Sequence, residues 1–135
     1  MNKISITYKV IPDLDSVIDL YNDANWTSYT SNPIQLENAL RNSLKVWTAW
    51  DGDLLVGLAR VVGDGYTIIY IQDILVLKSY QCKGLGSLLL NTILEEYQEL
   101  RQIVLLTDDS EKSVKFYEKN GLKPVGKNNC VAFMK

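Results

Sequence analysis

The stretch QDILVLKSYQCKGLGSLLL, from Gln72 to Leu90, carries the pattern from which the fold can be inferred. It begins with an apolar run, continues through a short polar turn that contains two glycines, and ends in a second apolar run. The first run is typical of a strand, and the second places apolar residues at helical spacing. The segment therefore predicts a strand that passes through a glycine turn into a helix from Gly84 to about Tyr97.

The segments on either side predict one sheet with helices on its faces. Alternating or continuous apolar runs predict strands, and apolar residues at helical spacing predict helices. The expected strands are residues 4–10, 45–50, 54–62, 67–77, 101–106, 122–126 and 129–135, and the expected helices begin near residues 13, 33, 84 and 108. We therefore expect a single α+β domain over residues 1–135, with a mostly antiparallel mixed sheet of about seven strands and about four flanking helices.

Composition indicates a compact protein and excludes several kinds of chemistry. The 135 residues are 47% hydrophobic and 22% charged, and the net charge of −2 disfavours a nucleic-acid partner. No apolar run approaches the ~20 residues of a membrane span and no signal peptide is evident, so we expect no membrane partner and a cytoplasmic location. The lack of histidine excludes Ser-His and Cys-His catalysis, and the two distant cysteines predict no metal site.

The turn Lys83-Gly84-Leu85-Gly86 matches neither of two common phosphate-binding loops. No lysine follows Gly86, as a Walker loop requires, and Leu89 occupies the third glycine position of a dinucleotide fingerprint. Two interpretations remain from the residues alone. The glycines could expose backbone amides at a helix N-terminus to an anion such as a pyrophosphate. Alternatively, they could only permit a tight turn and close packing.

Two motifs make the chain resemble the GNAT superfamily of acyl-CoA-dependent N-acetyltransferases. One is QCKGLG, residues 81–86, which is similar to the family signature Q/R-x-x-G-x-G/A and follows a strand that ends in ILVL. The other is KFYEKNGL, residues 115–122, which is similar to a family helix with an aromatic-Tyr-Glu run before glycine. Asp108 or Asp109 is expected to cap this helix, and Asn120-Gly121 to end it. The expected order of elements also matches the GNAT fold.

The resemblance implies acetyl-CoA (coenzyme A) or a close acyl-CoA as the cofactor. Its pyrophosphate would lie on the turn amides, and its pantetheine arm would lie along backbone groups of the strand that the family splays from its neighbour. The implied cofactor-binding residues are Ile74, Leu75, Val76, Gln81, Cys82, Lys83, Gly84, Leu85, Gly86, Ser87, Ser110, Ser113 and Tyr117. Ser110 and Ser113 depart from the family pattern, because many members carry Asn and Ala at these positions.

Asp73 and Tyr117 are the candidate catalytic residues. Acetyl transfer to an amine needs a group that removes the amine proton, and Asp73 is a candidate that shares a face with Ile71 and Leu75 if the strand alternation is unbroken. Asp73 could instead simply pair with Arg60 on a neighbouring strand. The resemblance implies that Tyr117 protonates the leaving CoA thiolate, although its position on a helix stripe also suits ordinary core packing.

Aromatic residues of the loop 22–33 and residues of the central strand form the candidate acceptor site. Trp26 and Tyr29 could form an aromatic wall that suits aryl groups or ammonium ions, or could merely pack over the helix pair. Tyr70 and Gln72 are expected on one face of the strand and, with Asp73, complete the candidate substrate-binding set.

The resemblance implies an enzyme that transfers an acetyl group from acetyl-CoA to a primary amine of a small molecule, by direct attack in a ternary complex. A weaker similarity within the family is to aralkylamine acetyltransferases. Two alternatives are a protein N-terminal or lysine acetyltransferase and an acyl-CoA-binding sensor without turnover. Because many relatives form homodimers, we also expect a homodimer.

Overall fold

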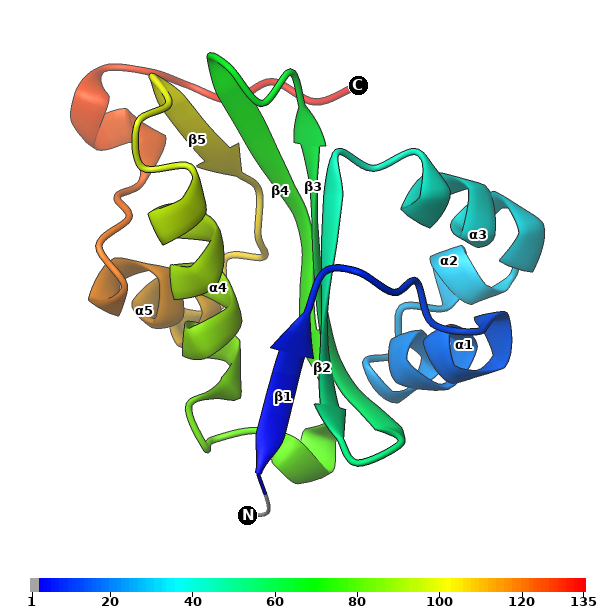
Figure 1. Cartoon of the computed structure of the whole chain (residues 1–135). Coiled ribbons are helices and arrows are strands. Elements are labelled where there is room, and N and C mark those ends of the chain that lie inside the picture. Colours follow the sequence, from blue (N-terminus) through cyan, green and yellow to red (C-terminus); the bar gives the residue numbers. More distant parts are fainter. Residues whose placement is uncertain (1–2) are drawn as a thin grey trace.

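The protein is built around a mixed sheet. The computed structural model describes residues 3–135, and within them five strands form one sheet in the order β1-β2-β3-β4-β5 (Figure 1). The strands are β1 (Ile4–Thr7), β2 (Lys45–Asp51), β3 (Leu54–Gly63), β4 (Ile68–Val76) and β5 (Gln102–Leu105). Neighbours from β1 to β4 are antiparallel, whereas β5 runs parallel to β4. The sheet is therefore mixed and mostly antiparallel, as the sequence predicts.

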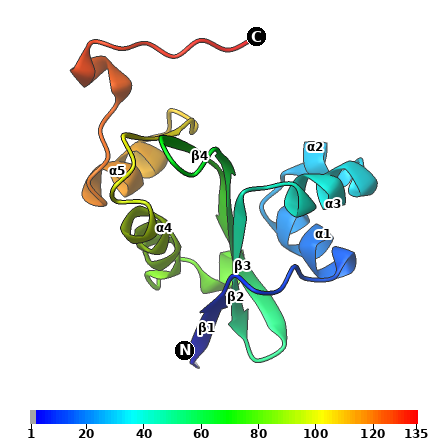
Figure 2. The same ribbon diagram turned by 45° about the horizontal axis from the view of Figure 1, so that its top comes forward.

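Helices cover both faces of this sheet, as Figures 1 and 2 show. The helices on one face are α1 (Leu14–Asp23), α2 (Thr27–Thr30) and α3 (Pro33–Arg41), and those on the other are α4 (Leu85–Glu96) and α5 (Glu111–Lys119). Two short 3-10 helices are η1 (Lys78–Tyr80) and η2 (Val125–Asn128). A hydrophobic cluster lies on each side of the sheet. None of the helices within residues 3–135 is both long and apolar enough to cross a bilayer.

Local sequence signals account for the start of the first helices. Asp13 caps α1, because its side chain accepts a hydrogen bond from the Ser16 amide at 2.9 Å. Asn32 caps α3 in the same way, and Pro33 occupies the first turn, where its missing N–H costs nothing. Both starts lie where the sequence predicts them.

The last helix begins with a different cap from the one expected. Ser110 caps α5, since its hydroxyl oxygen accepts a hydrogen bond from the Ser113 amide at 3.2 Å. Asp108 instead accepts a hydrogen bond from the Ser110 amide at 2.9 Å, which orders the turn before the helix. The expectation of an Asp108 or Asp109 cap is therefore wrong, because the aspartates lie two residues and one residue before the cap position.

A β-bulge interrupts β4 at Gln72 and decides which face Asp73 occupies. The register with β3 pairs Arg60 with Asp73 but Val61 with Ile71, so Gln72 is an extra residue. Ile71 therefore packs in the cluster beneath α4, whereas Asp73 contacts α1 on the opposite face. The expectation that Asp73 shares a face with Ile71 is wrong, because the bulge breaks the alternation of side chains.

Beyond the bulge, β4 and β5 diverge. They pair only over residues 68–71 of β4 and 102–105 of β5. The rest of β4, up to Val76, keeps β3 as one neighbour but has no strand on its other side within residues 3–135. This divergence leaves an open strand edge beside the turn that leads into α4.

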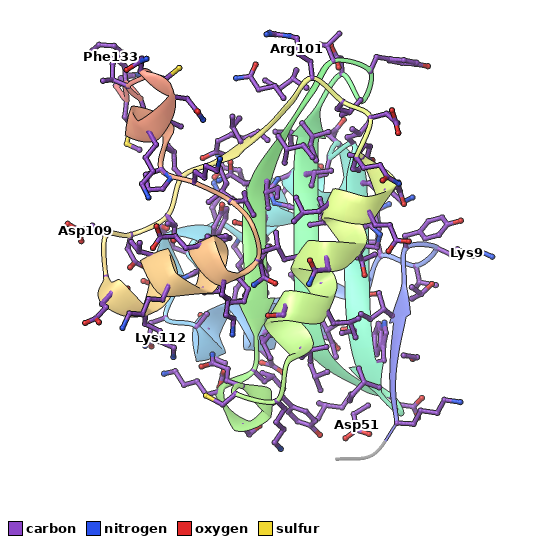
Figure 3. All side chains as sticks on the ribbon, turned by 90° about the vertical axis from the view of Figure 1, so that its left-hand side faces the viewer. Lys9, Asp51, Arg101, Asp109, Lys112 and Phe133 are labelled. Carbon is purple, nitrogen blue, oxygen red and sulfur yellow. The ribbon has the colours of Figure 1, made fainter. Side chains whose placement is uncertain are left out.

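The C-terminal residues do not form the two strands that the sequence predicts. Residues 122–124 lead into η2, which includes residues 125 and 126, and residues 130–135 are extended chain without a strand partner within the described part of the protein. Phe133, near the end of this segment, lies away from the sheet in Figure 3. A strand needs a neighbour to satisfy its backbone groups. Residues 3–135 therefore form a sheet of five strands and not of about seven.

Candidate active site

A cavity of about 1220 Å³ lies where β4 and β5 diverge. Residues 71–76 of β4 form one wall, and the glycine turn with the start of α4 forms a second. One side of α5 and the loop before it contribute a third wall, and residues 24–29 line the side toward α1. The cavity thus brings together the strand, the glycine turn, the last helix and the aromatic loop that the sequence analysis singles out.

The glycine turn places free backbone amides beside this cavity. Gly84 has φ +83° and Cys82 has φ +63°, immediately before α4 begins at Leu85. The amides from Cys82 to Ser87 bond to no acceptor within residues 3–135, and the first helical bond runs from the Leu88 amide to the Gly84 carbonyl at 2.9 Å. Free amides at a helix N-terminus carry partial positive charge. The turn is therefore chemically suited to an anion.

The two glycines of the turn have different structural roles. A Cβ at Gly84 would meet no heavy atom within 4 Å, so the positive φ is what favours glycine there. A Cβ at Gly86 would lie 3.4 Å from the ring of Phe116 on α5. The turn thus combines an accessible backbone at Gly84 with close packing of α4 on α5 at Gly86.

The other side chains of the turn make local contacts. Gln81 donates to the Val76 carbonyl at 3.0 Å, which ties the turn to the end of β4. Lys83 Nζ lies 3.4 Å from the Ser79 carbonyl, outside the cavity lining. The Leu85 side chain is buried in the core beneath α4. Lys83 and Leu85 are therefore the turn residues whose side chains do not reach the cavity.

Alternate residues of β4 direct their backbone groups toward the open edge. The Leu77 amide donates to the Val56 carbonyl at 2.9 Å, which identifies the hydrogen-bonded pairs of this antiparallel ladder. By alternation, Leu75 directs its amide and carbonyl toward β3, whereas Ile74 and Val76 direct theirs away from it. Of the three expected positions, Ile74 and Val76 therefore present backbone groups to the cavity.

Tyr117 lines the cavity from α5. Its half-buried position raises the pKa of its phenol above the ordinary value, and the nearby Asp108 and Tyr70 raise it further. A phenol with a raised pKa remains protonated at neutral pH and can donate its proton. Ser110 and Ser113 also line the cavity, but Ser110 caps α5 and the Ser113 hydroxyl donates to Asp108 at 3.1 Å.

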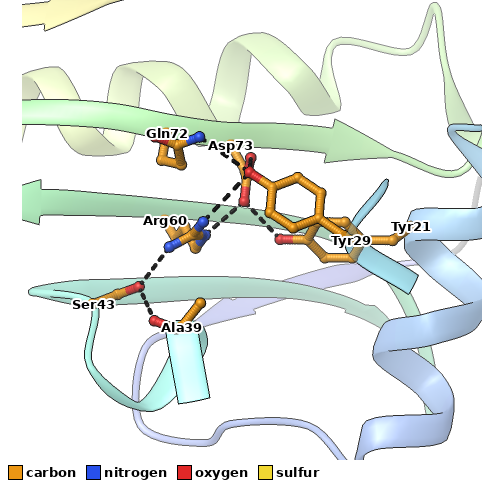
Figure 4. Close-up of polar contacts among 7 residues, drawn as sticks. All are labelled: Tyr21, Tyr29, Ala39, Ser43, Arg60, Gln72 and Asp73. Carbon is orange, nitrogen blue, oxygen red and sulfur yellow. Dashed lines mark hydrogen bonds and ion pairs between the residues drawn. The ribbon is translucent and has the colours of Figure 1, made fainter. Parts of the chain in front are cut away.

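Asp73 lies at the centre of a buried polar cluster (Figure 4). Its Oδ2 accepts hydrogen bonds from Arg60 Nε at 2.6 Å and from the Tyr21 hydroxyl at 2.9 Å. Its Oδ1 accepts a hydrogen bond from the Tyr29 hydroxyl at 2.9 Å. Arg60 also donates to Ser43 Oγ at 3.2 Å. The pairing with Arg60 that the sequence leaves as an alternative for Asp73 is therefore present.

This cluster controls the protonation of its own members. Burial raises the pKa of Tyr21, and the charge of Asp73 raises it further. Burial and then Asp73 likewise raise the pKa of Tyr29. Burial alone would lower the pKa of Arg60, but Asp73 outweighs burial and the pKa is raised. The raised pKa values agree with neutral phenols at Tyr21 and Tyr29 and a charged guanidinium at Arg60 at neutral pH.

Tyr29 connects the buried cluster to the cavity. It lines the cavity, and its hydroxyl oxygen accepts hydrogen bonds from Gln72 Nε2 at 3.0 Å and from Arg60 Nη2 at 3.4 Å. Because Gln72 is the bulged residue, one irregularity places both Gln72 and Asp73 against Tyr29. Tyr29 therefore lines the cavity while its hydroxyl group donates a hydrogen bond to Asp73.

Trp26 lines the cavity and also packs on the core. The ring centroids of Trp26 and Tyr29 are 6.2 Å apart, and both rings meet Tyr21 edge-on, at 5.8 and 5.1 Å. The aromatic loop therefore packs over the helix pair and also faces the cavity. Tyr70, in contrast, lies outside the cavity lining, and its hydroxyl accepts a hydrogen bond from the Leu106 amide at 3.2 Å.

Tyr21 belongs to the cluster although it is not among the site residues expected from the sequence, where it falls at helical spacing in the helix that begins near residue 13. Its ring is fully buried among apolar residues of α1 and α3. A tyrosine hydroxyl on such a stripe needs a hydrogen-bond partner, because an unpaired buried polar group is costly. That requirement is the signal in the sequence that points to a buried acceptor such as Asp73.

Comparison with known proteins assigns this architecture to a family. The model of the acetyltransferase (GNAT) family matches residues 12–122. The structure of the GNAT family acetyltransferase SP0256 from Streptococcus pneumoniae is 37% identical, with a TM-score of 0.87 over 98% of this chain and 97% of the other. The Staphylococcus aureus protein SA2161 is 30% identical, with a TM-score of 0.79 over 98% and 99%. The chain belongs to the GNAT acetyltransferase family.

Two further relatives extend this comparison. The N-acetyltransferase ycf52-like protein of Prochlorococcus marinus is 31% identical over 127 residues, which are 87% of this chain and 67% of that protein. The aminoglycoside N-acetyltransferase AAC(6')-Iy, solved in complex with CoA, has a TM-score of 0.75 but only 16% identity, so its likeness concerns the fold alone. The GNAT fold expected from the two motifs is therefore confirmed.

Proposed function

We propose that the protein transfers an acetyl group from acetyl-CoA to the primary amine of a small molecule, by direct attack in a ternary complex. The observation that carries this proposal is the divergence of β4 from β5. It places free strand-edge groups, free helix-start amides and a carboxylate cluster around one cavity. Membership of the GNAT acetyltransferase family supports acyl transfer, and the CoA complex of AAC(6')-Iy supports CoA as the carrier.

The residues of the cavity fit an acyl-CoA. The amides from Cys82 to Ser87 would hold the pyrophosphate, since an anion compensates the partial positive charge at the start of α4. The outward amide and carbonyl of Ile74 and the outward amide of Val76 would pair with the amide groups of the pantetheine arm, as a peptide adds to an open strand edge, whereas the Val76 carbonyl already accepts from Gln81. When bound, acetyl-CoA supplies an activated acyl thioester.

Asp73, acting through Tyr29, is the proposed base. An alkyl ammonium has a pKa near ~10, so the acceptor must lose a proton before it attacks. The Tyr29 oxygen lines the cavity, and its proton is directed at Asp73 Oδ1. When the amine replaces Gln72 Nε2 at the Tyr29 oxygen, the amine proton passes to that oxygen as the phenol proton passes to Oδ1, while Arg60 remains bonded to Oδ2. Asp73 then accepts a proton without touching the substrate.

Tyr117 is the proposed acid. The phenol is protonated at neutral pH, since even the ordinary pKa of 10.0 lies well above 7 and burial raises it further, so a proton is available for a thiolate that leaves the acyl group. Tyr117 lies on α5, whereas Tyr29 and Asp73 belong to α2 and β4. Acid and base thus approach the cavity from different walls, which allows donor and acceptor to lie between them.

The proposed acceptor is a small amine. Trp26 and Tyr29 form an aromatic wall beside Gln72, and aromatic faces attract ammonium groups as well as aryl groups. One observation favours the competing function of an acyl-CoA sensor. Asp73 is completely paired with Arg60, Tyr21 and Tyr29, as a purely structural carboxylate would be.

Thiol release distinguishes these two functions. The protein is mixed with acetyl-CoA and a panel of primary amines, including aralkylamines and polyamines, and free thiol is measured with time. We expect release that depends on at least one amine and that is lost in Tyr117→Phe. Tight CoA binding by calorimetry, with no thiol release from any amine, would overturn the transferase proposal in favour of the sensor.

A further inference from the structure

Asn120 forms a polar bridge between the end of α5 and the first turns of α4, which lie side by side on one face of the sheet (Figures 1 and 3). From the sequence, Asn120 is expected only to end its helix together with Gly121. In the structure its Nδ2 donates to the Phe116 carbonyl at 2.8 Å and to Ser87 Oγ at 3.2 Å. Its Oδ1 accepts a hydrogen bond from Asn91 Nδ2 at 3.1 Å. This side chain therefore joins the motif at the end of α5 to the glycine turn.

These contacts determine the orientation of the Asn120 amide. A carbonyl oxygen can only accept a hydrogen bond, so the group beside the Phe116 carbonyl must be the NH2 group. An NH2 group has two hydrogens, of which one is directed at the Phe116 carbonyl and the other at Ser87 Oγ. The Ser87 hydroxyl is therefore the acceptor in its contact with Asn120, and its own proton remains available.

The proton of the Ser87 hydroxyl has no protein acceptor within residues 3–135. A helical serine or threonine can donate to the carbonyl four residues earlier, as Thr92 does to the Leu88 carbonyl at 2.7 Å. Ser87 makes no such bond in the described part of the chain. It lines the cavity, whereas Asn120 lies outside the cavity lining. An unused hydroxyl proton thus lies at the cavity wall, next to the free amides of the glycine turn.

We propose that Asn120 is a positioning residue, which holds the Ser87 oxygen as an acceptor so that Ser87 donates its proton to a phosphate oxygen of the acyl-CoA. This inference rests on the proposed function, because it needs the pyrophosphate beside the amides from Cys82 to Ser87. An anionic phosphate oxygen can only accept, and a hydrogen bond to a charged acceptor is stronger than one between neutral groups. The two sequence motifs thus meet in one chain of hydrogen bonds, which runs from α5 through Ser87 to the cofactor.

The affinity for CoA measures the contribution of both residues. Titration calorimetry should show CoA binding weakened about tenfold in Ser87→Ala and at least about threefold in Asn120→Ala, because a hydrogen bond to a charged group is lost or loosened. In Asn120→Asp, a carboxylate of nearly the same shape takes the Ser87 proton and repels the phosphate, so affinity should fall by more than about tenfold. An Asn120→Asp variant that binds CoA as tightly as the unaltered protein would overturn the proposal.

The double variant Ser87→Ala/Asn120→Ala distinguishes positioning from an independent effect. Because Asn120 acts through Ser87, its replacement should weaken CoA binding no further once the hydroxyl is gone. Steady-state kinetics of each variant should show a higher KM for acetyl-CoA with little change in kcat, since the bond to the phosphate is present before and during acyl transfer alike. Losses of affinity that add in the double variant would show that Asn120 does not act through Ser87.

Asn42→Ala is the matched control. Asn42 is the C-cap of α3, and its Nδ2 donates to the Asn38 carbonyl at 2.8 Å, which is the same local bond that Asn120 makes to the Phe116 carbonyl. Asn42 lies outside the cavity lining, so Asn42→Ala should lower stability in urea as Asn120→Ala does but leave CoA affinity unchanged. Equal losses of CoA affinity in these two variants would reduce Asn120 to a helix cap.

The unaltered protein separates this inference from the proposal on which it rests. If the unaltered protein binds no CoA, the proposed function itself fails, and the positioning role fails with it. If CoA binds and amines release its thiol, but neither Ser87→Ala nor Asn120→Ala changes CoA affinity, only the positioning role of Asn120 is refuted.

Discussion

Arg60 Nε lies 2.6 Å from Asp73 Oδ2, and the two side chains are only 8% and 2% exposed. The pair joins β3 to β4 next to the bulge at Gln72. Tyr21 and Tyr29 donate to the same carboxylate from α1 and α2. This ion pair thus lies between the core of the protein and the wall of its cavity. Substitutions of Arg60, Asp73, Tyr21 and Tyr29 can therefore distinguish effects on folding stability from effects on the proposed catalysis.

Replacing Arg60 with methionine should destabilise the fold strongly. The substitution leaves the Asp73 carboxylate buried without its cation, and breaking a buried pair costs ~3–5 kcal/mol. Urea unfolding followed by tryptophan fluorescence measures the loss. The double variant Arg60→Met/Asp73→Leu should recover much of that stability yet remain inactive, because the proposed base is gone. An active double variant would contradict the role assigned to Asp73.

Tyr29→Phe should lower kcat by about 10²-fold with little loss of stability, because this hydroxyl is the proposed path from the amine to Asp73. Tyr21→Phe is the matched control, since it removes a second hydroxyl from the same carboxylate on the buried side. It should cost ~1–3 kcal/mol of stability and change kcat far less. Steady-state kinetics and urea unfolding of both variants give the comparison. Equal losses of kcat would argue against a relay through Tyr29.

Tyr117→Phe should lower kcat and leave CoA affinity nearly unchanged. The phenyl ring keeps its packing on α5, but the group that protonates the leaving thiolate is lost. Thiol release gives kcat, and titration calorimetry gives the affinity for CoA. Weaker CoA binding with normal turnover would show that Tyr117 acts in binding and not as the acid.

Gly84→Val should weaken CoA binding markedly, because its side chain would occupy the open space in front of the turn amides. Part of any effect comes from backbone strain, since φ at this position is +83°. Gly52→Val is the matched control, with φ +60° and equally open surroundings in the turn between β2 and β3. Both variants should lose stability, but only Gly84→Val should lose affinity in calorimetry. Unchanged affinity would exclude the amides as the pyrophosphate site.

Asp64 makes the stability of the β3–β4 turn depend on pH. Its carboxylate accepts hydrogen bonds from the amides of Thr67, Tyr66 and Ile68, and these bonds lower its pKa below the ordinary value of 3.8. A lowered pKa means that the stabilisation is complete above 3.8 and is lost as the pH falls through the folded-state value. Asp64→Ala should therefore lower Tm by a constant amount between pH 5 and pH 8.

The same comparison at acid pH is the decisive control. Below about pH 3.8 the difference in Tm between the unaltered protein and Asp64→Ala should narrow. Acid favours the protonated form of Asp64, and this form lacks the carboxylate hydrogen bonds just as alanine does. Thermal unfolding at a series of pH values measures this gap. A gap that widens in acid would reverse the sign of the linkage and exclude these hydrogen bonds as its cause.

Local features of this fold are readable from the sequence, because they depend on neighbouring residues. The helix starts near Asp13 and Pro33 and the glycine turn before α4 all lie where the sequence predicts them. The order of the strands up to β5 also follows from apolar runs separated by turns. The cap of α5 is the exception, because several polar residues in 107–113 could each begin a helix and only the folded turn selects Ser110.

The candidate site is only partly readable in this way. The motifs locate Tyr117 and the glycine turn, and the aromatic loop locates Trp26 and Tyr29. The bulge at Gln72 has no signature in the sequence, because it depends on how β3 and β4 pair. The strand alternation therefore gives Leu75 correctly but Ile71 wrongly as a neighbour of Asp73 on the same face. No motif indicates that Tyr21 contacts Asp73.

The sequence by itself determined the kind of elements, their order and the glycine turn, since helix caps, apolar periods and positive φ are properties of a few adjacent residues. Only the tertiary structure decided that Arg60, Tyr21 and Tyr29 meet at Asp73, because these residues come from four separate elements. It also decided that residues 129–135 stay outside the sheet. A strand exists only where another strand supplies its hydrogen bonds, and no segment within residues 3–135 does so for them.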